Sequence, residues 1–156
     1  MVEDLTHINA DGDVHMVSVG SKQSTDRVAI AEAFVTMDDD LRTKVFAGDT
    51  RKGDVLATVR IAAIMAAKRT SELIPLCHPL TLSGISVDVE QIDTGARIEV
   101  RVETSGQTGV EMEAMTAASI AAVTMYDMVK SVSKGVTIGP IQLVHKSGGK
   151  SGEWNR

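Results

Sequence analysis

The chain has 156 residues, of which 43% are hydrophobic and 24% charged, a composition typical of one globular domain with its own core. A net charge of −5 and an aromatic content of 3% argue against a nucleic-acid-binding protein, which needs basic surfaces and stacking platforms. Because no apolar stretch approaches a membrane span and Cys77 is the only cysteine, we expect a soluble cytoplasmic protein without a disulfide.

Residues 1–25 are predicted to form a loose N-terminal arm, because they are rich in Ser, Asp and Gly. Charged residues at the start of the arm interrupt any apolar signal segment. Within the arm, residues 14–19 form a short β-like island. Residues 28–37 alternate apolar and polar side chains, which favours a strand, although a helix fits them too. Three aspartates at 38–40 then supply capping groups for a short helix that ends at Gly48.

The middle of the chain predicts a second helix followed by a rigid turn. Asp54 has the chemistry of an N-cap for a helix over residues 55–69, in which the apolar positions are helix-spaced and mostly small. Pro75 and Pro79 bracket residues 76–78 and hold them in an irregular, restrained backbone.

The second half of the chain predicts a hairpin, a long helix and a final strand. In chain order, these are strands over 82–91 and 98–102, a helix over 110–133 and a strand over 136–146. Thr108 and Glu111 have the spacing of a capping box at the start of the helix, and Gly135 ends it. Residues 147–156, rich in Gly, Ser and Lys, predict a flexible tail.

This order of elements predicts an α+β fold, the ferredoxin-like β-α-β-β-α-β sandwich with an antiparallel sheet and one extra short helix. We therefore divide the chain into an arm (residues 1–25), a ferredoxin-like domain (26–146) and a Gly/Ser/Lys tail (147–156). The helices are rich in Ala and Met, and small side chains that permit close backbone approach are compatible with a subunit interface.

Two segments have the composition of anion sites. Lys52 and Gly53, just before a helix start, can present an ammonium and free N–H groups to an anion, but the residues alone favour an ordinary basic turn before a capped helix. Residues 149–151 resemble the end of a P-loop, yet Val144 stands where that motif requires glycine, so we reject it. A lysine tail folding over a phosphate and a solvated tail both stay open.

The proline-bracketed turn contains Cys77 and His78. His78 is a candidate donor to a substrate oxygen, with a structural turn histidine as the alternative. A nucleophilic Cys77 would need a base from elsewhere in the fold. The histidines lack the spacing of metal ligands, so the sequence predicts no metal site.

The long helix has carboxylates at both ends. Glu111 and Glu113 suit the helix dipole in the first turn, while Asp127 and Lys130 are one turn apart. The second pair is either an exposed ion pair or a proton-transfer couple with pKa values drawn toward neutrality, and apolar neighbours favour the couple. On a helical wheel Glu113 and Asp127 lie within about 40° of each other.

Five segments, in order along nearly the whole chain, resemble the cyclic pyranopterin monophosphate synthase family (molybdenum cofactor biosynthesis protein C). They are residues 52–55 (KGDV), 73–80 (LIPLCHPL), 108–114 (TGVEMEA), 126–128 (YDM) and 146–152 (KSGGKSG). The resemblance implies a lyase that converts 3′,8-cyclo-7,8-dihydro-GTP to cyclic pyranopterin monophosphate and pyrophosphate. It also implies a homohexamer, a trimer of dimers, with the site at a dimer interface.

By this resemblance the catalytic residues are Asp127 and Lys130. The substrate-binding residues it implies are Lys52, Leu76, Cys77, His78, Glu111, Met112, Glu113 and Lys146. No cofactor is required, and Mg²⁺ accompanying the triphosphate is compatible with this assignment.

Two other functions compete with this one. A ferredoxin-like domain can be a sensor that binds a guanine nucleotide and releases it unchanged, because the fold does not decide the function. A different phosphoryl-transfer enzyme has less support, because the sequence contains neither a Walker motif nor carboxylates with two-metal spacing.

Overall fold

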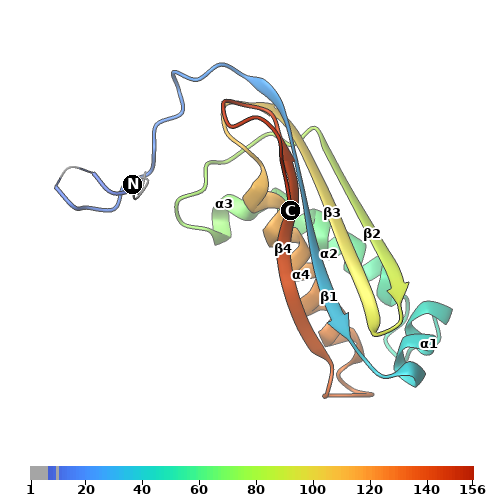
Figure 1. Ribbon diagram of the computed structural model, residues 1–156. Helices are drawn as coiled ribbons and strands as arrows, with labels where there is room; N and C mark the ends of the chain where they lie inside the picture. The colour runs from blue at the N-terminus through green and yellow to red at the C-terminus, as the bar shows by residue number, and fades with distance from the viewer. Residues whose placement is uncertain (1–6, 10) are drawn as a thin grey trace.

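The computed structural model describes residues 7–9 and 11–156, which form an α+β domain (Figure 1). The strands are β1 (Thr25–Thr36), β2 (Gly84–Ile92), β3 (Gly95–Gly106), β4 (Thr137–Ser147) and β5 (Trp154–Asn155). The helices are α1 (Asp39–Ala47), α2 (Val55–Lys68), α3 (Thr70–Leu73) and α4 (Glu111–Val129). Among the described residues, no helix combines the length and the apolar character that crossing a membrane requires.

The five strands form one sheet in the order β2-β3-β1-β4-β5, and every neighbouring pair is antiparallel. The first four strands have the order expected of the split β-α-β-β-α-β motif, so the predicted ferredoxin-like fold is confirmed. Helices α2 and α4 lie side by side on one face of this sheet (Figure 1). The short helix α3, between α2 and the proline-bracketed turn, was not predicted.

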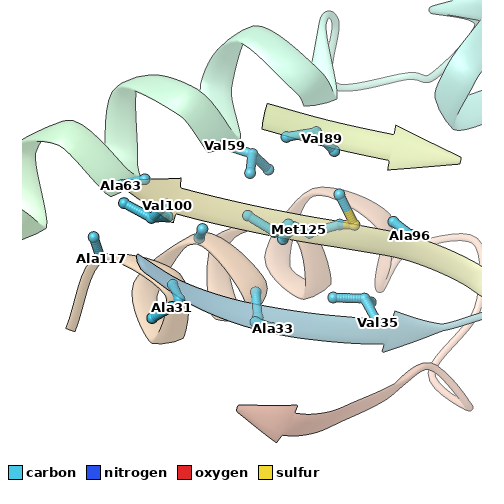
Figure 2. Close-up of a cluster of buried hydrophobic side chains, with 14 of the residues drawn as sticks. Ala31, Ala33, Val35, Val59, Ala63, Val89, Ala96, Val100, Ala117 and Met125 are labelled. Atoms are coloured by element: carbon cyan, nitrogen blue, oxygen red, sulfur yellow. The ribbon is translucent and has the colours of Figure 1, made fainter. Parts of the chain in front are cut away.

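The core lies between this sheet face and the two long helices, and small side chains dominate it. The alternate residues Ala29, Ala31 and Ala33 of β1 are fully buried, as are five alanines of α4 at positions 114, 117, 118, 121 and 122. Figure 2 shows members of this cluster gathered between the strands and the helices. Because alanine adds only one methyl group, the helix backbone packs close to the sheet, with little room for larger side chains.

The predicted caps of the first two helices are confirmed. Asp38 accepts a hydrogen bond from the Leu41 amide at 2.8 Å, and Asp54 accepts one from the Ala57 amide at 2.9 Å. Gly48 ends α1 with φ of 74°, a left-handed conformation that glycine adopts without steric cost.

The long helix begins at Glu111, within one residue of the predicted start, but the predicted capping box and the predicted end are wrong. The residue that precedes the helix is Val110, whose side chain makes no capping bond, and the Glu111 carboxylate contacts Lys146. The helix ends at Val129 rather than near residue 133. Two serines and a valine, all poor helix formers, follow Lys130 and do not continue the helix.

The two ends of the chain also differ from the expected pattern. Residues 14–19 form no strand, and only Val14 makes an isolated bridge, to Ile8. In the tail, Trp154 pairs with Lys146, so the chain returns to β4 after the glycine-rich loop. Residues 1–6 and 10, which include the start of the predicted arm, lie outside the described residues.

Candidate active site

A cavity of about 280 Å³ lies at the N-terminal end of α4, and we call it the Glu113 cavity. The proline-bracketed turn and the first turn of α4 supply six predicted site residues to its wall: Leu76, Cys77, His78, Glu111, Met112 and Glu113. The turn is in place because Pro75 and Pro79 exclude regular structure, and the Cys77 amide donates to the Ile74 carbonyl at 3.1 Å.

The Glu113 carboxyl is the most perturbed titratable group at this cavity. Its residue is only 4% exposed, and this burial raises the pKa of Glu113 from its usual 4.5 to about 7. A backbone hydrogen bond opposes the rise, and the nearby charge of Glu111 adds to it. Near neutral pH, Glu113 therefore exists both with and without its proton, which suits a group that transfers protons.

Burial, followed by the charge of Glu113, also raises the pKa of the Cys77 thiol. The thiol is therefore protonated at neutral pH, whereas a nucleophilic cysteine needs a lowered pKa. The structure does not favour Cys77 as a nucleophile.

The Glu113→Gln variant is expected to be more stable than the parent protein above pH 7, by about 1–3 kcal/mol, because one pKa unit corresponds to about 1.4 kcal/mol. The folded protein holds the Glu113 proton more tightly than the unfolded chain, so this carboxyl lowers stability progressively as pH rises from 4.5 to about 7. Chemical denaturation of both proteins between pH 4 and 8 measures the difference. The exposed Glu72→Gln is the control, and a stability difference that does not change with pH would contradict the assignment.

Lys146 reaches the rim of the same region from β4. Its Nζ donates to Glu111 Oε1 at 2.8 Å, and the two side chains are 27% and 30% exposed. This contact joins the last long strand of the sheet to the start of α4.

Cationic residues that the sequence did not single out lie next to the cavity. Lys22, in the arm, lines the Glu113 cavity together with His7. Lys22 also lines an adjoining cavity of about 420 Å³ with Arg27 and Lys150, so three cations converge there. Isolated basic residues in a Ser-rich arm and at a strand start form no motif, so no signal in one sequence marks Lys22 or Arg27.

A second cluster, which we call the Asp127 cluster, lies at the other end of α4. Lys52 Nζ donates to the Asp127 carbonyl at 2.6 Å and to Oδ2 at 3.2 Å, and Lys130 Nζ lies 2.7 Å from Oδ1. The structure therefore brings together Asp127, Lys130 and the lysine that precedes α2.

The titration of this cluster differs from the expected one. Asp127 accepts hydrogen bonds from Lys130 and Lys52, and these bonds, the one from Lys130 first, lower the pKa of Asp127. In turn, Asp127 raises the pKa of Lys130. The expectation of pKa values drawn toward neutrality is wrong for the single chain, because the Asp127 side chain is 55% exposed and water solvates its charge.

The Glu113 cavity and the Asp127 cluster do not meet within one chain. Glu113 and Asp127 are on one helix and close in wheel angle, but a rise of 1.5 Å per residue separates them by about 21 Å along its axis. One chain therefore holds two separate groups of the predicted residues. Within residues 7–9 and 11–156, no group of three His, Cys, Asp or Glu side chains is arranged to hold a metal ion.

Comparison with known proteins links the whole chain to one family. Residues 16–149 match the model of the MoaC family. Among its curated relatives are the cyclic pyranopterin monophosphate synthases of Corynebacterium efficiens and Corynebacterium glutamicum. Each is 51% identical to this chain over 154 residues, which cover 99% of this chain and 99% of the relative.

Proposed function

This chain belongs to the MoaC family, and from that membership we propose how its residues carry out cyclic pyranopterin monophosphate synthesis. The chain is a lyase of molybdenum cofactor biosynthesis, with the activity of relatives that share half of its residues over almost their full length. Its substrate in this proposal is 3′,8-cyclo-7,8-dihydro-GTP, and the second product is pyrophosphate. The gathering of six predicted residues around the Glu113 cavity is the observation that carries the assignment of the site.

The proposed active site is shared between two chains. Since the Glu113 cavity and the Asp127 cluster lie about 21 Å apart on one helix, a compact nucleotide cannot contact both within one chain. A two-fold axis across the middle of α4 would place the cavity of one chain opposite the cluster of its copy, because Ile120 lies midway between Glu113 and Asp127.

The outer surface of the helix layer supports this arrangement. Exposed apolar side chains lie between the Glu113 cavity and the Asp127 cluster. They are Ile61 and Met65 of α2 and Ile120 and Val123 of α4. A second copy seated there would remove them from water, which favours association. The proposed assembly is a homohexamer of three such dimers acting in the cytoplasm, where the free thiol of Cys77 fits a reducing compartment.

The chemistry proposed for the shared site combines charge neutralisation with proton transfer. Lys52, Lys130 and Lys146 neutralise the triphosphate and the leaving pyrophosphate. Glu113 and Asp127 move protons while the purine ring opens and the pterin ring closes, before a hydroxyl of the sugar-derived part attacks the α-phosphorus and expels pyrophosphate. Enclosure against a second chain desolvates Asp127 and Lys130, which opposes the pKa shifts of the exposed pair. Mg²⁺, where it accompanies the triphosphate, enters as part of the substrate.

Incubation of the purified protein with 3′,8-cyclo-7,8-dihydro-GTP tests this function directly. Mass spectrometry should detect cyclic pyranopterin monophosphate, with one pyrophosphate released per molecule formed. Recovery of the intact nucleotide would instead favour the ligand sensor, and any other phosphorylated product would indicate a different phosphoryl-transfer reaction.

The Lys52→Ala variant is expected to raise KM about tenfold or more at low ionic strength, because a hydrogen bond to a charged group contributes about 1.5–3 kcal/mol. The increase should shrink as salt is added, because salt screens the attraction between an exposed ammonium and a phosphate. Initial rates measured at several salt concentrations test this expectation. Lys68→Ala, on the exposed side of α2, is the control, and an unchanged KM at low salt would remove Lys52 from the site.

A further inference from the structure

The segment between β3 and α4 contains a glycine whose backbone conformation does not require glycine. Gly109 is absent from the glycines with positive φ, so an alanine is sterically acceptable to the main chain there. The space around Gly109, in contrast, leaves no room for a side chain. A Cβ at Gly109 would lie within 2.8 Å of all three carboxyl atoms of Glu111, which is closer than real Cβ atoms approach their neighbours.

The Glu111 carboxylate therefore occupies the space that a side chain at position 109 would fill. From this position it accepts the hydrogen bond of Lys146 Nζ at 2.8 Å. Gly109 and Glu111 both line the Glu113 cavity, so the contact fixes the lysine at the edge of the proposed site. Val110, the residue before α4, makes no side-chain capping bond, and the Glu111 carboxylate bonds to Lys146 in place of a cap.

We propose that Gly109 is a positioning residue: its missing side chain lets the Glu111 carboxylate fold back and hold the Lys146 ammonium beside the cavity. The catalytic part of this inference rests on the proposed function, whereas the geometric part stands on the contacts alone. Gly109 touches no reacting atom in this account and acts only through Glu111.

The Gly109→Ala substitution should disturb the site without disturbing the fold. The atoms that meet the new Cβ are at the far end of a flexible side chain, so Glu111 can rotate away at little cost to stability. Lys146 then loses its partner. Because small errors in position can cost a hundredfold in rate, kcat/KM should fall by about 10- to 100-fold with an almost unchanged melting temperature.

Gly106→Ala, at the last residue of β3 and just before this connection, is a matched control. Its Cβ would meet the Thr104 hydroxyl oxygen at 3.4 Å, an ordinary contact, and its φ is not positive. We expect this variant to retain parental kcat/KM and stability. A similar loss in both variants would show that positions 106 and 109 merely tolerate no side chains, and would overturn the proposal.

The experiment that decides the geometric part measures Lys146 directly. Limited acylation of lysines in the full-length protein, followed by peptide mass spectrometry, reports how freely each ammonium reacts. Labelling of Lys146 should rise several-fold in Gly109→Ala and in Glu111→Ala, stay at the parental level in Gly106→Ala, and rise no further in the Gly109→Ala/Glu111→Ala double variant.

Equal Lys146 labelling in the parent and Gly109→Ala, or an added effect of Gly109→Ala when Glu111 is already alanine, would overturn the proposal. The same data separate it from the proposed function. If the parent protein leaves the cyclised nucleotide unchanged while Lys146 labelling follows the expected pattern, the function fails and the positioning of Lys146 by Gly109 is supported.

Discussion

Asp127→Ala is expected to lower turnover of the cyclised nucleotide by about 10²–10⁴-fold, the usual contribution of a group that transfers protons in the rate-limiting step. Asp127 contacts both Lys52 and Lys130, so its removal also disperses the two cations of the Asp127 cluster. Pyrophosphate release in a coupled assay, together with mass spectrometry of the pterin product, measures the loss.

The fold should survive this substitution, because Asp127 is exposed and surface ion pairs contribute little to stability. Asp39→Ala provides the matched control, since Asp39 forms an ion pair with Arg42 of the same i, i+3 type on another helix. Parental turnover in Asp127→Ala would remove Asp127 from the mechanism. Loss of turnover in both variants would show that ion pairing in general, rather than this site, is at fault.

Two inactive variants are expected to restore each other when mixed. Glu113→Ala damages the Glu113 cavity and Asp127→Ala damages the Asp127 cluster, which are different halves of the proposed shared site. In a mixed dimer, one of the two sites combines both intact halves. Dissociation and reassembly of equal amounts should therefore recover about one quarter of the parental activity, from an almost inactive start.

The control mixes variants of the same half. Asp127→Ala and Lys130→Ala both damage the Asp127 cluster, so no pairing of these chains produces an intact site, and the mixture should stay inactive. Recovery in this control, or failure of the Glu113→Ala and Asp127→Ala mixture after verified exchange of subunits, would contradict a site shared across a two-fold axis.

The elements of the fold could be predicted wherever a local signal agreed with the tertiary structure. Asp38 and Asp54 cap their own helices, and the alternating residues of β2 and β3 predict a hairpin because the two strands are adjacent in sequence. The capping box at Glu111 failed for the opposite reason. A residue 35 positions later in the chain, Lys146, binds the carboxylate that the local pattern assigned to the helix cap.

The composition of the site could be predicted more completely than its geometry. The proline-bracketed turn and the first turn of α4 do meet at one cavity, as the family resemblance implied. A helical wheel, however, records angle and not axial distance, so it placed Glu113 and Asp127 together although about 21 Å separates them. The exposure of Asp127, and hence the direction of its pKa shift, depends on which surfaces cover it, and residue order does not encode this.

Helix α4 connects the Glu113 cavity and the Asp127 cluster as one rigid element. Its buried alanines face the alanines of β1 without spare volume, and its ends carry Glu113 and Asp127. An added methyl group anywhere along this seam would push a rigid rod, and both ends would move together. In a two-fold assembly each of the two chains contributes a Glu113 cavity to one site and an Asp127 cluster to the other. One substitution in the core, present in both chains, would therefore misalign four half-sites. Larger side chains at these positions would therefore lower turnover at every site of the assembly as well as the stability of each chain.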